Sequence, residues 1–269
     1  MKKTVQIKDL VQQVSKQIIW FTGLNNHNKK SYIDYLKMYK VAVKTAKMTN
    51  PTIVPYLILD GEKDEYINDL INMGVNVIHH QVNFFDSLKD FYGDNTTAYG
   101  AFLRIDIPKI CESLGIESDY ILYTDNDVMF MDDVTPLLNL KPKYFMCTGE
   151  FSQEFIPSLM NSGVMWINWK SMLNEYDEFV FFIKNNLQHF TAFDQDSFRI
   201  YYQHKMESFD YNYNYKPYWG YNKGIKILHF HGPKPVYTDE KLNSFEYPTL
   251  ITDFFNQTKE IFNKILSEI

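Results

Sequence analysis

The chain has 269 residues, of which 45% are hydrophobic, and its formal net charge is −6. This acidic balance argues against a protein whose main partner is a nucleic acid, because the phosphate backbone would repel it. No apolar run approaches the length of a membrane span, and the polar start of the chain lacks the apolar centre of a signal peptide, so we expect a cytoplasmic protein.

The first half of the chain alternates short apolar runs, which indicate buried strands, with amphipathic segments, which indicate helices. Ser31 is the expected N-cap of the longest helix, and a later helix is expected to bend or restart at Pro108. The predicted elements are a helix at 5–16, a strand at 18–23, a helix at 31–48, a strand at 53–59, a helix at 62–73, a strand at 75–78, an irregular segment at 81–97, a helix at 99–114 and a strand at 120–123.

This alternation predicts an α/β fold with a mostly parallel sheet whose strands are joined by crossover helices. The second half is less regular, and no linker separates it from the first, so we expect a single domain over residues 1–269. Its predicted elements are strands at 143–148, 162–167 and 225–230, helices at 169–185, 194–203 and 254–265, and an aromatic segment at 211–221 that either lines a ligand site or packs in the core.

Two carboxylates follow the strand at 120–123, in the run Asp125-Asn126-Asp127. Side chains two apart on an extended chain point the same way, so Asp125 and Asp127 can face one ligand together. Two hard oxygen ligands suit Mg²⁺ or Mn²⁺. Because ligands sit at the carboxyl ends of strands in such sheets, we predict a metal here that holds the diphosphate of a nucleotide-sugar. The alternative is a polar turn that caps the strand.

Four further stretches place polar groups at a strand end or a helix start, where a parallel sheet assembles one cleft from distant segments. Arg104 can donate a planar fork of hydrogen bonds to a phosphate or a sugar hydroxyl, or can be an ordinary salt-bridged residue. The second stretch, Asn161-Ser162-Gly163, can approach a ligand closely and offer donors and acceptors, or can be an ordinary turn. The third, Asp194-Gln195-Asp196, can bind sugar hydroxyls or can cap a helix. The fourth, His229 to Lys234, can supply a metal ligand and a charge for a phosphate, or can contain a structural histidine and a solvated lysine.

The runs 104–108 and 120–128 resemble the nucleotide-sugar glycosyltransferases of family eight, which have the GT-A fold. Residues 161–165, 194–196 and 229–235 also match that family, in the family's order. The resemblance covers roughly residues 98–236. It implies a nucleotide-binding half at 1–140 and a donor-sugar and acceptor half at 141–269.

The resemblance also implies roles for single residues. Asp125 and Asp127 would bind Mn²⁺ or Mg²⁺ with His229 as the third ligand, although the neighbouring His231 leaves that third position open. The donor sugar, expected on UDP, would contact Arg104, Asn161, Asp194 and Gln195, and its diphosphate would contact Gly232 and Lys234. Beside the resemblance, we expect the nucleotide over the ends of the first strands, starting at Phe21, Thr22 and Gly23, and we expect Asn126, Ser162 and Gly163 to contact the donor as well. Asp194, Gln195 and Arg104 are the expected catalytic residues.

The expected reaction is transfer of a hexose or pentose to a glycan or another hydroxyl acceptor, with retention of the anomeric configuration, as the family implies. A divergent relative could instead invert, with Asp194 or Asp196 as the base. A third hypothesis is a nucleotide-sugar-binding module without catalytic activity. A nucleotidyltransferase is less favoured, because no glycine-rich basic loop follows the first strand.

Overall fold

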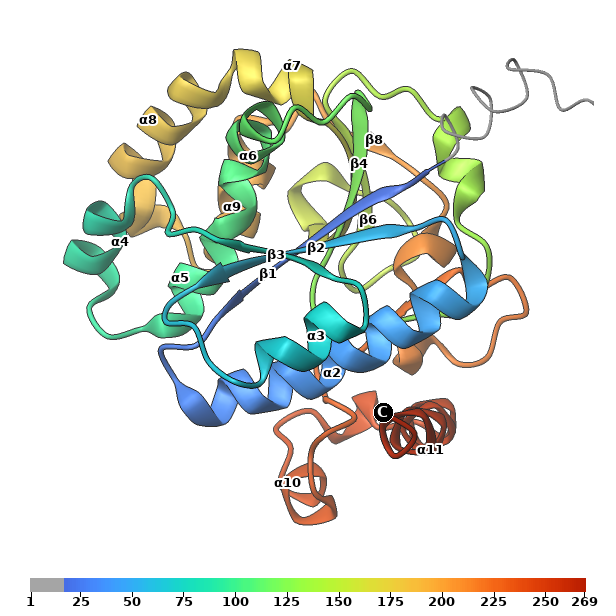
Figure 1. Ribbon diagram of the computed structural model, residues 1–269. Helices are drawn as coiled ribbons and strands as arrows, with labels where there is room; N and C mark the ends of the chain where they lie inside the picture. Colours follow the sequence, from blue (N-terminus) through green and yellow to red (C-terminus); the bar gives the residue numbers. More distant parts are fainter. Residues whose placement is uncertain (1–16) are drawn as a thin grey trace, which may run out of the picture.

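A seven-stranded sheet lies at the centre of the computed structural model, which describes residues 17–269 (Figure 1). The strand order is β3-β2-β1-β4-β7-β6-β8. The first four of these strands are parallel to one another, and β7 runs antiparallel to both of its neighbours. The strands are β1 (Ile19–Asn25), β2 (Val54–Asp60), β3 (Asn76–His79), β4 (Tyr120–Thr124), β6 (Phe145–Gly149), β7 (Met160–Asn168) and β8 (Glu207–Ser208). The predicted α/β class with a mostly parallel sheet is confirmed.

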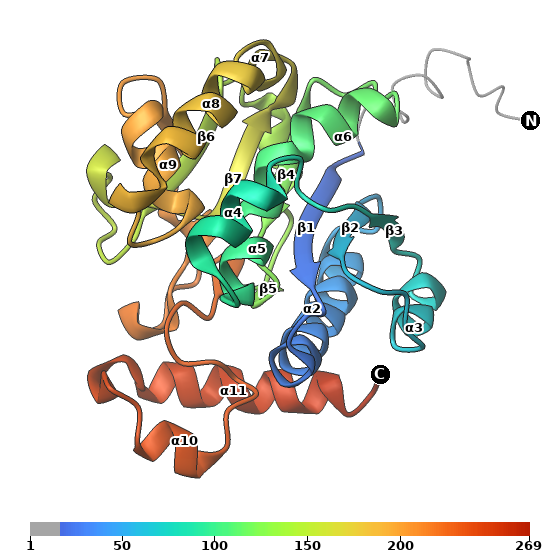
Figure 2. The same cartoon turned by 90° about the vertical axis from the view of Figure 1, so that its left-hand side faces the viewer.

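Helices cover both faces of the sheet (Figure 1). The helices are α2 (Lys29–Thr49), α3 (Ile67–Asn72), α4 (Phe85–Tyr92), α5 (Thr96–Phe102), α6 (Ile107–Ser113), α7 (Trp169–Asn174), α8 (Tyr176–Asn186), α9 (Asp194–Tyr201), α10 (Asp239–Asn243) and α11 (Asp253–Leu266). Successive side chains of β1 point to opposite faces of the sheet and so belong to two separate cores. Trp20 packs with α2 and α3, whereas Phe21 packs with the helices of the opposite face. In Figure 2, α11 lies against α2.

Several predicted elements differ from the observed ones. The helix expected at 5–16 lies outside the described residues. Residues 81–97 were expected to be irregular but contain α4, because Phe84 and Leu88 lie four residues apart and bury themselves together in the core. Asn28, rather than Ser31, caps α2: its side chain accepts a hydrogen bond from the backbone N–H of Ser31 at 3.1 Å.

Two predicted helices are broken. The segment at 99–114 divides into α5, a 3-10 turn η1 (Leu103–Asp106) and α6, and Pro108 lies in the first turn of α6, where it needs no N–H partner. The segment at 169–185 divides into α7 and α8 at Glu175. The aromatic segment at 211–221 forms two 3-10 turns, η5 (Tyr211–Asn214) and η6 (Pro217–Trp219).

A separate two-stranded sheet brings the late part of the chain to the end of β4. Strand β5 (Val128–Phe130) pairs antiparallel with β9 (Ile227–His229), and Val128 lies opposite His229. The backbone N–H of Phe230 donates to the carbonyl of Asp127 at 2.9 Å and continues this pairing. The small sheet therefore places His229 beside Asp127. Within residues 17–269, none of the helices has the length and apolar character to cross a bilayer.

Candidate metal centre and its cavity

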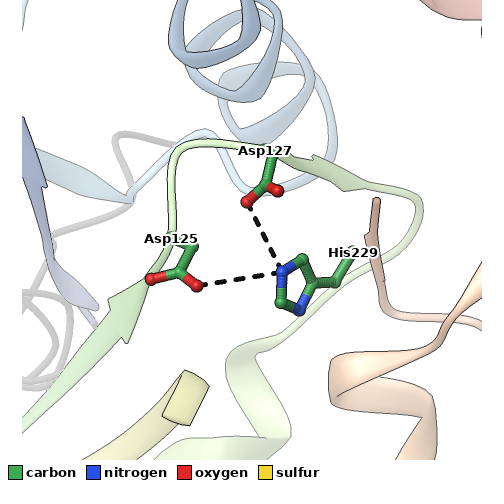
Figure 3. A group of neighbouring side chains, drawn as sticks. All are labelled: Asp125, Asp127 and His229. Atoms are coloured by element: carbon green, nitrogen blue, oxygen red, sulfur yellow. Dashed lines mark ion pairs between the residues drawn. The ribbon is translucent and has the colours of Figure 1, made fainter. Parts of the chain in front are cut away.

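Three potential metal ligands meet where β4 ends (Figure 3). Nε2 of His229 lies 3.4 Å from Oδ1 of Asp127 and 3.8 Å from Oδ2 of Asp125. One ligand atom from each of the three residues lies within 4.8 Å of the others. Two carboxylates and one imidazole form a donor set that Mn²⁺ or Mg²⁺ accepts, and three protein ligands leave coordination positions for phosphate oxygens. The residues present therefore fit such an ion.

Asn214 orients the imidazole of His229. Its Oδ1 lies 2.8 Å from Nδ1 of His229, and its Nδ2 donates to Oδ1 of Asn161 at 2.9 Å. Because the amide oxygen faces the ring, Nδ1 carries the proton and the lone pair of Nε2 points at the two carboxylates. Metal-ligating histidines are commonly fixed through their second nitrogen in this way. The sequence interpretation missed Asn214, whose only signal is that it is polar within an aromatic run.

His231 lies apart from the carboxylates. Its Nδ1 lies 3.0 Å from the hydroxyl of Tyr218, and its Nε2 lies 3.5 Å from Oε1 of Glu150. Of the two histidines, the structure thus brings His229 to the acidic pair.

Gly163, on β7, leaves the space that the His229 ring occupies. A Cβ at this position would lie 2.2 Å from Cε1 of His229 and 2.9 Å from Oδ2 of Asp125. Its carbonyl also accepts a hydrogen bond from the backbone N–H of Asp125 at 2.8 Å. Any larger residue would displace one of the two ligands, so the glycine is required by close approach rather than by backbone conformation.

Lys234 forms an ion pair with Oδ2 of Asp127 and donates to the carbonyl of Phe230 at 2.9 Å. Burial alone would raise the pKa of Asp127, but Lys234 and His229 outweigh it and hold that pKa well below its usual range. Asp127 is therefore ionised at neutral pH. Its Oδ1 faces His229 while Oδ2 faces Lys234, so one carboxylate serves both groups.

Arg104 joins the acidic pair to α9. Its Nη2 donates to Oδ1 of Asp125 at 2.9 Å, and its Nη1 donates to the carbonyl of Ser162 at 2.5 Å. Its Nε lies 2.9 Å from Oδ2 of Asp194, at an angle that does not make a hydrogen bond. The guanidinium also lies over the ring of Tyr123, 4.4 Å from its centroid. Arg104, itself buried, therefore lies between two carboxylates and links Asp125 to Asp194.

The three side chains that open α9 have different surroundings. Burial raises the pKa of Asp194 to about 7; Arg104 opposes this shift and Asp125 reinforces it. The amide of Gln195 is fixed at both ends, because its Oε1 accepts from the backbone N–H of Ser162 at 2.9 Å and its Nε2 donates to Glu150 at 2.9 Å. Asp196 accepts from the backbone N–H groups of residues 191 and 192, so it ties the preceding loop to the first turn of the helix.

A cavity of about 230 Å³ opens beside the metal centre. Seven of the residues expected to bind the metal or the donor line it: Gly23, Arg104, Asp125, Asn126, Asp127, His229 and Lys234. Eight expected residues do not line it: Phe21, Thr22, Asn161, Ser162, Gly163, Asp194, Gln195 and Gly232. Lining residues that the sequence interpretation missed include Asn25, Asn28, Ser31, Tyr32, Tyr35 and Thr97.

Phe21 and Thr22 are turned away from the cavity for a simple reason. Side chains alternate along β1, so Phe21 faces the core, where its ring stacks on Tyr56 with 4.9 Å between centroids. The hydroxyl of Thr22 donates to Oδ1 of Asn126 at 3.2 Å, and Nδ2 of Asn126 donates to the carbonyl of Gly23 at 2.7 Å. Thr22 thus supports the turn between the two aspartates rather than the cavity wall.

Comparison with known structures shows the same fold elsewhere. The galactosyltransferase LgtC, solved in complex with donor and acceptor sugar analogs, is 16% identical with a TM-score of 0.68, and the match covers 94% of this chain and 96% of that one. The glycosyltransferase GlyE of Streptococcus pneumoniae is 18% identical with a TM-score of 0.62 and covers 93% of this chain. Mouse xyloside xylosyltransferase 1 is 16% identical with a TM-score of 0.58, covering 82% of this chain and 100% of that one.

This chain spans 64% of the GlyE chain. No curated protein sequence matches it significantly. The sheet, its helices and the structural neighbours show that the chain has the GT-A fold. The family model described as glycosyl transferase family 8 matches residues 30–235, which is more than half of the chain. The chain belongs to this family, and the resemblance stated from the sequence is confirmed.

Proposed function

We propose that this chain is a metal-dependent enzyme that transfers a hexose or pentose from a nucleotide-sugar, with a UDP-sugar as the donor, to a glycan or another hydroxyl acceptor with retention. The observation that carries the proposal is the group of Asp125, Asp127 and His229 on the wall of a cavity. Mn²⁺ or Mg²⁺ held by these residues would neutralise diphosphate charge and stabilise the departing nucleotide.

The surrounding residues have distinct roles in this proposal. Lys234 lines the cavity beside Asp127 and supplies a positive charge for the diphosphate. Arg104 also lines the cavity and faces the donor sugar, held in place by Asp125 and Ser162. Tyr32 and Tyr35 of α2 line the same cavity together with Asn25 and would contact the base and ribose.

A screen of nucleotide-sugars and free nucleotides for Mn²⁺-dependent thermal stabilisation tests this assignment. A ligand that binds only the folded state raises the free energy of unfolding by about 2.7 kcal/mol at a hundred times its Kd. We expect a UDP-sugar to raise the melting temperature with Mn²⁺ and much less with EDTA. A matched assay for transfer and donor hydrolysis separates an enzyme from a binding module, since binding without turnover would support the module.

One observation favours the inverting alternative, in which a carboxylate acts as a general base. A base works best with a pKa near the working pH, and the pKa of Asp194 is raised to about 7, whereas that of Asp196 is lowered. If Asp194 is the base, turnover rises with pH through about 7, because only the ionised form accepts a proton. Asp194→Asn would then abolish this dependence together with most activity.

The anomeric configuration of the product, followed by proton NMR, decides between the two mechanisms. Retention is the expected outcome, with Asp194→Asn lowering turnover but leaving the product configuration unchanged. Asp196→Asn is the matched comparison, because this carboxylate holds the loop before α9 and pairs with Arg199 at 3.0 Å. An inverted product would contradict the proposed retention. Loss of activity in Asp194→Asn but not in Asp196→Asn would then assign Asp194 as the base.

A further inference from the structure

Lys216 is fully buried behind the metal centre, between η5 and η6. Its Nζ donates to three oxygens: Oδ1 of Asn161 at 3.2 Å, the carbonyl of Asn214 at 3.0 Å and Oδ1 of Asn214 at 2.5 Å. Within residues 17–269 no carboxylate lies at ion-pair distance from it. The amino group is thus held by amide oxygens alone.

Burial of an amino group without a carboxylate partner is costly, and an apolar side chain of similar length would fill the same space without that cost. Packing alone therefore does not account for a lysine here. The contacts of Nζ are the feature that distinguishes Lys216 from such a substitute.

The two side-chain amides that Lys216 contacts are the ones that support the site. Oδ1 of Asn214 also faces Nδ1 of His229 at 2.8 Å. Oδ1 of Asn161 also accepts from Nδ2 of Asn214 at 2.9 Å and from the backbone N–H of Gly163 at 3.2 Å. Both amides thus turn their oxygen ends toward Lys216.

A side-chain amide has an oxygen end and an NH₂ end of nearly the same shape, and the hydrogen-bond network decides which way it points. If the Asn214 amide were reversed, its NH₂ would donate to Nδ1 of His229, and the ring proton would move to Nε2. That proton would occupy the lone pair that faces Asp125 and Asp127. Burial lowers the pKa of Lys216, yet all three close contacts of its Nζ are acceptor oxygens to which the amine donates. A reversed Asn214 amide would place an NH₂ donor against this donating amine, so Lys216 disfavours the reversal.

We propose that Lys216 is a positioning residue that keeps Asn214 oriented toward His229 and so keeps Nε2 of His229 free to bind the metal. This inference rests on the metal centre of the proposed function. It assigns a role to a buried residue that touches neither the metal ligands nor the cavity wall.

The test is the affinity for Mn²⁺ alone, measured by electron paramagnetic resonance of free Mn²⁺ in wild type, Lys216→Met, Asn214→Ala and the double variant. Residues that orient a metal ligand typically change affinity by about 10–100-fold. Because Lys216 acts through Asn214, we expect about tenfold weaker binding for Lys216→Met. The double variant should bind Mn²⁺ no more weakly than Asn214→Ala, because Lys216 acts on His229 only through Asn214 and has no effect once that side chain is removed.

Two measurements separate positioning from a general structural role. Lys226→Met is the matched control, because Lys226 pairs with the partly exposed Asp132 outside the site, and it should bind Mn²⁺ like wild type. The melting temperature of metal-free Lys216→Met should equal or exceed that of wild type, since both amide oxygens keep another donor.

Wild-type affinity in Lys216→Met, or a loss that adds fully to that of Asn214→Ala, would overturn the proposal. If Lys216→Met does not fold, Lys216→Leu, which is shorter, is measured in the same way; failure of both to fold would mean that Lys216 supports the fold instead. If wild type itself binds no Mn²⁺, the metal centre of the proposed function fails and this inference fails with it. The wild-type titration thus distinguishes the two failures.

Discussion

Asp127→Asn is expected to lower kcat by at least about 10²-fold, the effect typical of losing one charge-stabilising group in a site. The amide keeps the size of the carboxylate but removes its negative charge, so it binds a divalent ion weakly. The substitution also removes the charged partner of Lys234. Because breaking a buried ion pair is destabilising, we expect a lower melting temperature as well.

The measurement is the initial rate of transfer or donor hydrolysis as a function of Mn²⁺ concentration, with circular dichroism as the check on folding. Asp132→Asn is the control, because Asp132 is partly exposed, pairs with Lys226 and lies outside the cavity. It should retain wild-type turnover. A folded Asp127→Asn protein that turns over at a near-normal rate would show that this carboxylate does not hold a catalytic metal.

Gly163→Ala is expected to remove metal binding almost completely, although it adds only one methyl group. The new Cβ would lie 2.2 Å from Cε1 of His229, far inside van der Waals contact, so the ring must leave its place between the carboxylates. The ring has little room to move, since His229 is buried and held by Asn214. We expect turnover to fall as far as in His229→Ala.

Mn²⁺ affinity and turnover of Gly163→Ala are compared with those of Gly224→Ala. At Gly224 the nearest atom to an added Cβ is Nδ2 of Asn212 at 3.2 Å, the end of a flexible side chain, so this variant should behave like wild type. The prediction is wrong if Gly163→Ala binds Mn²⁺ as tightly as wild type.

The sequence was sufficient to predict the acidic pair and its position, because both depend on local pattern. An apolar run identifies β4, and residues two apart at its end share one side. The same reasoning predicted that β9 ends near the site with His229. Local pattern could not show that His229 rather than His231 lies at the acidic pair, because this depends on the register between β5 and β9.

Other parts of the site depend on tertiary contacts that no local pattern reports. Tyr32 and Tyr35 lie on one side of α2, and only the packing of that helix on the sheet shows that they reach the cavity. Asn214 and Lys216 lie in a segment without a period, so their convergence on His229 could not be predicted. Phe21 and Thr22 were expected at the cavity, but the alternation of β1 directs both elsewhere.

The pairing of β5 with β9 has a consequence for how the protein matures. Two of the three ligands follow β4, and the third is supplied by the opposite strand of a ribbon whose halves are distant along the chain. During synthesis, a nascent polypeptide that stops before residue 227 carries the aspartates without their imidazole. The metal can therefore bind fully only after β9 has paired with β5. Proteolytic cleavage that releases β9 should abolish activity while the central sheet remains folded.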